Sequence, residues 1–543
     1  MPEFVVGTGL AIAGLLLGIK GVVGGYVLIR DVFASDQGLQ DRALKYDIER
    51  IKFEAWSDRL KTKDEANCLL NNESKVVQDV VAQIIAEILA LQETVGKKFI
   101  EKYSMAPIAA PIPGKPGGPG ARPAFHKEAP WIAHFRHERD KKKQPHRIAW
   151  AVLDKDRFTD VLDRLATLNQ DLEALVRPEE FDATRLVTSI LSGIDERLSL
   201  ALLPTVASSS SSSSPSLLSL AALLKLVQEE DVETAAARVK HIDAADLDLL
   251  YEPNATTIRS DATYQPAGTL PQSALVEWKY IDATNVAKSV IVTANPDELH
   301  RLPCFGTFDD LAYEQASKGN RRIGLVYSVP RGVELDGQSS PSLLRLIRQR
   351  STRPPLGARF ELARRLAGAV ALLHASNWLH KSLRSDNILF SGKGVHDAKI
   401  TAPYICGFQY SRPGADTSIE SRPLGVPELD VYYHPDVAQR WNKVREVYSL
   451  GIVLLEVALW RPVFVEIYKT MTMAEMSKDI ITELDGKFGR DVAGLVGTAY
   501  VDVVKCCLKG EFCVTTGNSR QEGKVLSKSF WQKVVEPLAG CKA

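Results

Sequence analysis

A short polar segment in the second half of the chain carries the side chains best suited to chemistry. The stretch HKSLRSDNILF, His380 to Phe390, contains Ser382, Asp386 and Asn387. In phosphoryl transfer an asparagine can hold a magnesium ion, while an aspartate orients and deprotonates the attacking hydroxyl. Ser382 is neutral and cannot accept a proton as a carboxylate does. Asp386 directly precedes Asn387 and is not an obvious substitute.

The spacing of this segment resembles the catalytic loop of protein kinases, H-R-D-L-x-x-x-N, with Ser382 at the position of the aspartate. Other stretches resemble further kinase elements in the same order along the chain: ALVEWK, which ends in Lys279, RIGLVYSVPRG, LARRLAGAVALLHAS, YICGF with Cys406, YYHPDVA, and REVYSLGIVLLEVALWRP with Glu446 in place of the usual aspartate. The resemblance implies a bilobal, α+β, protein-kinase-like domain over residues 263–543.

The residues that kinase chemistry needs are missing from this domain. Ser382 replaces the catalytic aspartate, and Cys406 replaces the aspartate that binds magnesium. Magnesium prefers oxygen ligands, whereas a thiol is soft and mostly protonated at neutral pH. The stretch before Lys279, YQPAGTLPQS, has a single glycine and no phosphate-binding glycine loop. We therefore expect a pseudokinase that is not an enzyme.

The surviving motif residues also have simpler interpretations. Lys279 and Asn387 are candidate nucleotide-binding residues, and we expect weak or absent ATP binding and no other cofactor. Alternatively, Lys279 forms a buried ion pair with an acid such as Glu298, and Asn387 and His380 brace the loop. Cys406 then serves as a small buried apolar side chain.

Bulk composition describes an ordinary globular protein of several domains. The chain has 543 residues, of which 45% are hydrophobic and 25% charged, with 67 basic and 67 acidic residues. This balance gives no reason to expect a nucleic-acid partner. Seven scattered cysteines are typical of a reducing compartment. Four histidines lie near one another, but without acids or cysteines in ligand spacing we expect no metal site there: His126, His134, His137 and His146.

The N-terminal segment Phe4 to Ile29 is unusually apolar. Its uncharged part, up to Ile19, would span about 24 Å as a helix, which is short of a hydrocarbon core of roughly 30 Å. A helix that is apolar on every side can equally be the central helix of a soluble bundle. Glycines recur through the segment, and they would allow close helix packing in lipid or inside a bundle: Gly14, Gly18, Gly21 and Gly25.

Periodicity divides the chain into an all-α half and a mixed half. Helical spacing dominates residues 1–203, apart from an insert at about 105–147 that is rich in Pro and Gly and then basic around Lys141. The serine-rich residues 204–216 have the composition of a flexible linker. We expect a helical connector over residues 217–262, before the kinase-like domain.

Residues 1–203 resemble the HeLo domain, a helical bundle of fungal prion-inhibition and incompatibility proteins. The resemblance rests on the apolar N-terminus, on LKYDIERIKFEAWSDRL, and on the combination of Trp150, Asp154, Lys155 and Phe158. It implies membrane activity of the N-terminal segment in programmed cell death. A bundle fused to a pseudokinase also resembles the architecture of the mixed-lineage-kinase-domain-like protein. The candidate membrane-active residues are Phe4, Leu10, Ile12, Leu15, Leu16, Leu17 and Ile19.

These patterns lead to a working hypothesis and two alternatives. We expect a cytoplasmic, non-catalytic signalling protein that is recruited to the plasma membrane. It would bind protein partners, associate with itself and contact an anionic lipid surface. Its helical bundle would be a cell-death or heterokaryon-incompatibility effector controlled by the pseudokinase. The alternatives are an atypical active kinase that binds ATP, and a self-associating scaffold without membrane activity.

Overall fold

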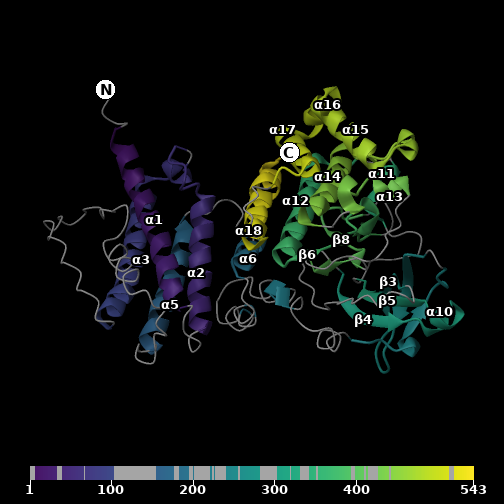
Figure 1. The fold of residues 1–543 in the computed structure, drawn as a ribbon, viewed down its shortest axis with the longest axis horizontal. Coiled ribbons are helices and arrows are strands. Elements are labelled where there is room, and N and C mark those ends of the chain that lie inside the picture. The colour runs from purple at the N-terminus through teal and green to yellow at the C-terminus, as the bar shows by residue number, and fades with distance from the viewer. Residues whose placement is uncertain are drawn as a thin grey trace. The chain divides into compact units, whose positions relative to one another are not determined.

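The chain forms two compact units, Met1–Ser212 and Ser213–Ala543, in the computed structural model (Figure 1). Their boundary falls inside the serine run predicted as a linker. The structure describes residues 6–33, 40–66, 68–102, 155–175, 183–194, 200, 203, 221–222, 225–226, 240–254, 257–281, 302–317, 320–329, 341–349, 353–392, 398–408, 411–413, 426–438, 442–512 and 519–543. The basic insert, the four histidines, Glu298 and Phe4 lie outside these ranges.

The first unit is a bundle of helices around one apolar core. Its long helices are α1 (Val6–Phe33), α2 (Gln40–Arg59), α3 (Lys75–Lys102) and α5 (Lys155–Leu175), with a shorter α6 (Ala183–Gly193) and a 3-10 turn η2 (Leu69–Asn72). Helix α1 packs against both α2 and α3, and α5 packs against α2 and α3. The predicted all-α fold of this region is confirmed.

Helix α1 lies in the core of this bundle because apolar side chains cover most of its circumference. Ile12, Leu15, Leu16 and Ile19 are buried among α2, α3 and α5 side chains, while Leu17 is half-buried. Leu10 falls within the helix, but its side chain is outside the described set. Among the helices described, none is both long enough and apolar enough to cross a bilayer.

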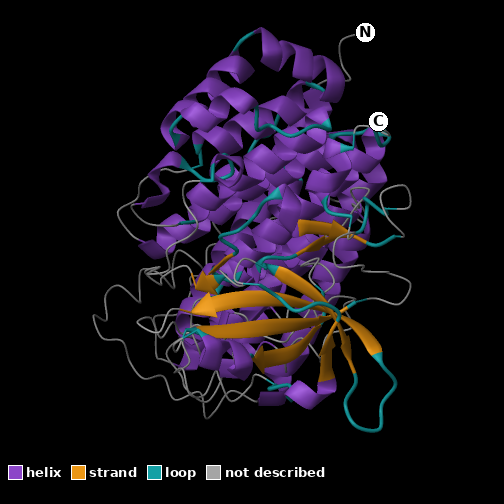
Figure 2. Cartoon of the chain, turned by 90° about the vertical axis from the view of Figure 1, so that its right-hand side faces the viewer, coloured by secondary structure: helices purple, strands orange, loops and turns teal. Residues whose placement is uncertain are grey.

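The second unit begins with a five-stranded antiparallel sheet in the order β1-β2-β3-β5-β4 (Figure 2). Its strands are β1 (Leu247–Leu249), β2 (Arg259–Tyr264), β3 (Gln272–Ile281), β4 (Cys304–Asp309) and β5 (Arg321–Ser328). Strand β3 is central, and its register places Glu277 opposite Arg259 on β2 and Lys279 opposite Ile323 on β5. A 3-10 turn η4 (Ala244–Asp246) precedes the sheet, and α10 (Leu311–Ala316) connects β4 to β5.

The expected helical connector at residues 217–262 is wrong in its last part. Residues 247–249 and 259–264 form β1 and β2, so the sheet starts before residue 263. In β2 three consecutive buried residues, Ser260 to Ala262, face the two sides of the sheet alternately. Polar side chains at buried strand positions hid this strand from a search for apolar alternation.

Helices make up most of the remaining described residues of the second unit. They are α11 (Leu343–Arg348), α12 (Leu356–Ala375), α13 (Pro427–Asp430), α14 (Lys443–Leu459), α15 (Met473–Asp485), α16 (Lys487–Val496), α17 (Thr498–Lys509), α18 (Ser519–Phe530) and α19 (Glu536–Gly540). Short elements join them: η6 (Ser385–Asn387), η8 (Pro435–Ala438), η9 (Glu466–Thr470), the π-turn η10 (Trp531–Val535), and the strand pairs β6 (Trp378–Leu379) with β9 (Arg412–Pro413) and β7 (Ile388–Phe390) with β8 (Pro403–Ile405).

Helix α14 is the centre of this helical part. It packs against α12, α16 and α17, and every residue from Glu446 to Ala458 is buried. Such all-round burial explains the nearly continuous apolar sequence of the helix. Two acidic residues inside it, Glu446 and Glu456, are fully buried. Both must be compensated by hydrogen bonds, since an unpaired buried charge is costly.

Candidate functional site

The kinase-like loop is a buried turn held by the first carboxylate of α14. Lys381 has φ 63°, a left-handed conformation that is costly for a residue with a Cβ. Its backbone N–H donates to Glu446 Oε1 at 2.6 Å, and His374 Nε2 lies 2.8 Å from Glu446 Oε2. Burial alone would raise the pKa of Glu446, but the contacts with His374, His380 and Lys381 lower it. The anion therefore fixes the backbone beside Ser382.

His380 is fully buried and uncharged at neutral pH. Its Nδ1 accepts the Ser382 N–H at 3.2 Å, and its ring lies edge-on to Phe408 with 4.5 Å between the centroids. Burial lowers the pKa of His380 to about 4, because the imidazolium would be desolvated. In this position the ring supports the loop backbone.

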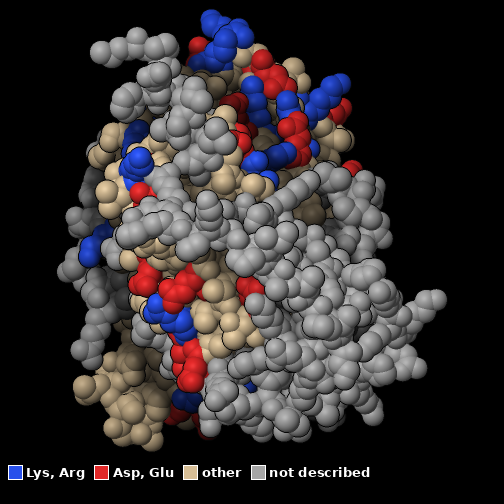
Figure 3. All heavy atoms as spheres, turned by 90° about the vertical axis from the view of Figure 1, so that its left-hand side faces the viewer, with Lys and Arg blue, Asp and Glu red and all other residues tan. Residues whose placement is uncertain are grey.

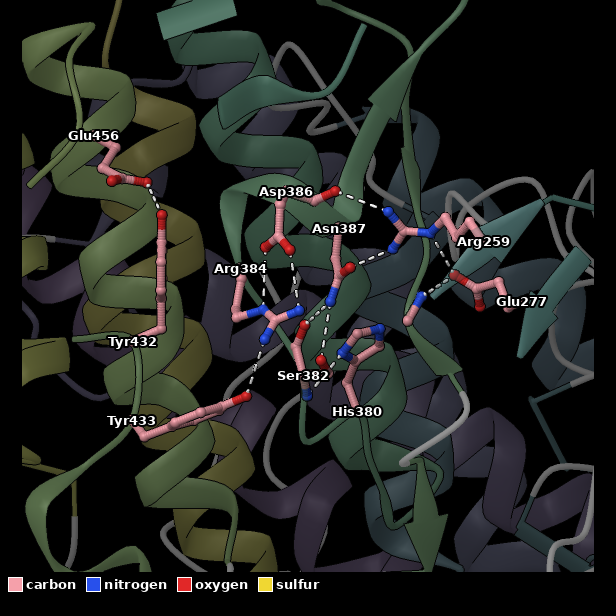
Figure 4. Close-up of polar contacts among 11 residues, drawn as sticks. Arg259, Glu277, His380, Ser382, Arg384, Asp386, Asn387, Tyr432, Tyr433 and Glu456 are labelled. Carbon is pink, nitrogen blue, oxygen red and sulfur yellow. Dashed lines mark hydrogen bonds and ion pairs between the residues drawn. The ribbon is translucent and has the colours of Figure 1, made fainter. Parts of the chain in front are cut away.

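The side chain of Asn387 is completely engaged within the protein. Its Nδ2 donates to the carbonyl oxygen of Ser382 at 2.6 Å and to Ser382 Oγ at 2.9 Å. Its Oδ1 accepts a hydrogen bond from Nη2 of Arg259 on β2 (Figure 4). A cation at Oδ1 would lie beside the Arg259 guanidinium, which is an unfavourable site for a metal ion.

Asp386 is held on the other side of the loop. Its two carboxylate oxygens accept from Nε and Nη2 of Arg384, both at 3.0 Å, in a bidentate pair (Figure 4). Arg384 also approaches the Tyr433 hydroxyl at 3.4 Å. Burial tends to lower the pKa of Arg384, but Asp386 and Tyr433 raise it overall. Asp386 is thus paired with Arg384 and does not take the place of the aspartate that Ser382 replaces.

A buried carboxylate on β3 joins the sheet to this site, and the sequence analysis missed it. Glu277 has no exposed surface. It pairs with Arg259 Nε at 3.0 Å and accepts the backbone N–H groups of Gly407 at 2.6 Å and Phe408 at 3.3 Å. Burial would lower the pKa of Arg259, but Glu277 is among the neighbours that raise it. The Arg259 guanidinium therefore stays protonated beside Glu277.

Gly407 is required by this arrangement. Its φ of +94° is left-handed, and a Cβ there would lie 2.5 Å from Nδ2 of Asn387. The preceding residue, Cys406, is buried in an apolar cluster with Leu275 and Leu389, and its N–H donates to the Asn387 carbonyl at 2.8 Å. The thiol at the metal-ligand position is therefore in apolar surroundings.

Lys279 lies two residues beyond Glu277 and is also buried, with 4% of its surface exposed. Alternation along a strand puts both side chains on the same side of β3. The expected partner, Glu298, is outside the described residues, so that ion pair stays a prediction. Neither connection before β3 is glycine-rich: residues 265–271 contain one glycine, Gly268, and residues 250–258 contain none.

A second buried carboxylate lies on α14. Glu456 accepts a hydrogen bond from the Tyr432 hydroxyl at 2.8 Å (Figure 4). It also accepts from Val463 N–H at 3.0 Å and from the Ser385 hydroxyl. Burial raises the pKa of Glu456 to about 7 despite these donors. The Glu456 carboxyl group connects the kinase-like loop with the YYHPDVA segment.

Across the described residues, no cluster of three or more His, Cys, Asp or Glu is arranged to hold a metal ion.

In the first unit, polar contacts hold the C-terminal half of α1. Gln92 of α3 donates through Nε2 to the Val22 carbonyl at 3.1 Å. Asn169 of α5 donates to Glu49 Oε2 at 2.9 Å and approaches the Tyr26 hydroxyl at 3.4 Å. Burial raises the pKa of Tyr26, so its hydroxyl stays neutral while the oxygen accepts from Asn169. These bonds give α1 a defined position that apolar packing alone would not.

The first unit matches a known family model. Residues 7–203 match the HeLo family model. Its description is prion-inhibition and propagation. The match covers the whole bundle, including the buried α1.

Figure 3 shows one face of the molecule, on which described basic and acidic side chains are interspersed without a patch of one sign. The basic insert of the HeLo region is not among them.

The second unit has weaker matches. Residues 328–539 match a family model described as a domain of unknown function, DUF7580. A putative cyclin-dependent kinase F-2 of Oryza sativa subsp. japonica is 30% identical over 138 residues, 24% of this chain and 39% of that protein. A serine/threonine-protein kinase-like protein of Arabidopsis thaliana is 33% identical over 104 residues, 19% of this chain and 28% of that protein. The chain therefore matches well under half of these relatives' length.

Proposed function

We propose that this protein is a non-catalytic signalling protein of a cell-death or incompatibility response. In this proposal the HeLo region is the effector and acts on an anionic membrane surface. The second unit is a pseudokinase that restrains the effector through protein contacts. The protein would reside in the cytoplasm and move to the plasma membrane when a partner or self-association releases it.

The observation that carries the effector role is the HeLo match over a bundle whose most apolar helix is buried. A helix this apolar is well suited to an interface with lipid once it leaves the bundle. In the closed bundle its side chains Ile12, Leu16 and Ile19 are inaccessible. Membrane activity would therefore require a conformational change, and an inactive resting form follows naturally.

The non-catalytic role of the second unit is supported by Glu277 and Asn387. Polyphosphate near Lys279 would meet the Glu277 carboxylate, and the Asn387 oxygen is already bonded to Arg259. We expect the purified full chain to transfer no radiolabelled phosphate from ATP above background, with magnesium or manganese. The rival interpretation, an atypical kinase, would be established by transfer that Lys279→Ala abolishes.

The effector role is tested by separating the two units. A protease site placed in the serine run 208–214 would allow the full chain to be folded first, then cut and fractionated. We expect the uncut chain to leave phosphatidylserine-containing vesicles intact and the released HeLo region to make them leak. A restraint of only about 1.4 kcal/mol would lower the released population about tenfold.

The controls distinguish the remaining alternatives. The same chain without the protease site, treated identically, should stay inactive. If the released region forms larger assemblies by light scattering but causes no leakage, the scaffold interpretation is correct. Equal leakage from cut and uncut chains would remove the restraining role of the second unit.

A further inference from the structure

Four segments of the second unit meet at one ion pair, formed by the fully buried Glu277 and the partly exposed Arg259. Arg259 comes from β2 and Glu277 from the central strand β3. The loop element η6 contributes Asp386 and Asn387, and the turn after β8 contributes Gly407. Figure 4 shows the guanidinium between the loop and the Glu277 carboxylate. The pair is thus placed where the sheet contacts the helical part.

Arg259 and Glu277 bond to each other within the sheet, and each also bonds to residues of the helical part. Arg259 Nε faces Glu277 within the sheet, whereas its Nη1 donates to the Asp386 carbonyl at 3.0 Å and its Nη2 to Asn387. Glu277 accepts the N–H groups of Gly407 and Phe408. Four hydrogen bonds therefore connect the sheet to the two segments that resemble kinase motifs.

An ion pair with these partners fixes how the sheet is placed on the loop more than it adds net stability to the fold. A buried ion pair often contributes little compared with apolar side chains of similar volume, because both charges are desolvated. Removing one partner is costly, because the other charge stays buried. The fork of Arg259 fits only one arrangement of the Asp386 carbonyl, the Asn387 oxygen and the Glu277 carboxylate. That arrangement holds the sheet in one position on the loop.

We propose that Arg259 and Glu277 form a built-in clasp that closes the sheet onto the helical part with no ligand, in the place where a kinase would hold its nucleotide. The inference rests on the pseudokinase part of the proposed function. In the clasp, Arg259 bonds to the Asn387 oxygen, and Glu277 bonds to the backbone N–H groups of the two residues that follow Cys406. It therefore makes the closed form of the unit independent of ATP.

Amide exchange in the full chain tests the clasp. Arg259→Gln and Glu277→Gln each remove a charge and should speed exchange of the peptide containing Gly407 and Phe408 by about tenfold. The matched control is Arg321→Gln, which breaks an exposed pair with Asp309 in the same sheet and should leave that peptide unchanged. The Arg259→Gln/Glu277→Gln double variant should exchange less than the product of the single effects predicts, because the partners are coupled.

A conservative variant and a nucleotide titration complete the test. Arg259→Lys keeps the charge but cannot bridge three acceptors, so exchange should rise even where circular dichroism shows a folded chain. Magnesium ATP should not shift the melting temperature of the wild-type chain. Stabilisation by ATP would overturn the clasp, as would an unchanged exchange rate in Arg259→Lys and Arg259→Gln. Phosphotransfer is measured separately and bears on the proposed function.

Discussion

At the scale of single residues, Glu456 is a buried group that titrates near neutral pH. Burial raises its pKa from an ordinary value of 4.5 to about 7, so the folded protein holds this proton more tightly than the unfolded chain does. Stability from this group is fully present below pH 4.5 and is lost as the pH rises to about 7. The loss is up to about 3 kcal/mol, from 1.36 kcal/mol per pKa unit.

Glu456→Gln removes this titration and should remove its pH dependence. The free energy of unfolding of wild type minus that of the variant should fall as the pH rises from roughly 5 to 7, and then stay constant. Urea unfolding across this range measures the difference. His380, whose pKa burial lowers to about 4, has the opposite effect below neutral pH but is present in both proteins and cancels. A flat difference would show that Glu456 titrates normally.

The sequence could identify individual motif positions but not their partners. Ser382, Cys406 and Glu446 can be recognised because each occupies a motif position where kinases carry an aspartate. The structure places the first and third within one hydrogen-bonded loop region. Arg259 and Glu277 are 18 residues apart along the chain, and the register of two strands brings them together. Pairing register cannot be read from β2, since its residues RSDATY lack alternation. One signal was available, namely a glutamate inside the apolar strand ALVEWK.

At the scale of elements, helices were predicted better than strands. The helix of REVYSLGIVLLEVAL is continuous and buried, so its sequence alone indicates α14. Strand β1, by contrast, has only three residues, Leu247 to Leu249, and depends on pairing with β2 for its existence. Local composition carries little information on such a strand. The sheet edge was therefore assigned to a helical connector.

The glycine pattern of α1 fits close helix packing either in lipid or in a soluble bundle, and only the neighbours of each glycine distinguish the two. A Cβ on Gly25 would lie 2.1 Å from Oε1 of Gln92, and a Cβ on Gly21 would lie 3.4 Å from Leu89. Gly14 has no such neighbour within 4 Å. Gly25 therefore serves close packing of α1 on α3, as in the soluble-bundle interpretation, whereas a Cβ on Gly21 would make only an ordinary contact with Leu89. Helix pairing in lipid stays a prediction.

At the scale of the whole molecule, the proposal requires α1 to separate from the bundle. Helix α1 fills the core between α2 and α3, so deleting it would unfold the bundle and could not test membrane activity. A reversible cross-link is more informative, because it leaves the core intact. Gly25 on α1 and Gln92 on α3 are the positions chosen, because the Gln92 side chain reaches Gly25 and its amide bonds to Val22.

We predict that a disulfide between Gly25→Cys and Gln92→Cys prevents leakage by the HeLo region. The full chain would carry both substitutions and the protease site, be oxidised while folded, and then be cut and fractionated. Under oxidising conditions α1 stays tied to α3 and vesicles should remain intact, whereas dithiothreitol should restore leakage. Gln92→Cys alone, treated in the same way, controls for loss of the Gln92 hydrogen bond to Val22 and for the native cysteines, and it leaves Gly25 in place. If the oxidised pair is confirmed by mass spectrometry and vesicles leak as fast as after reduction, release of α1 is not the mechanism, and another surface of the bundle acts on the membrane.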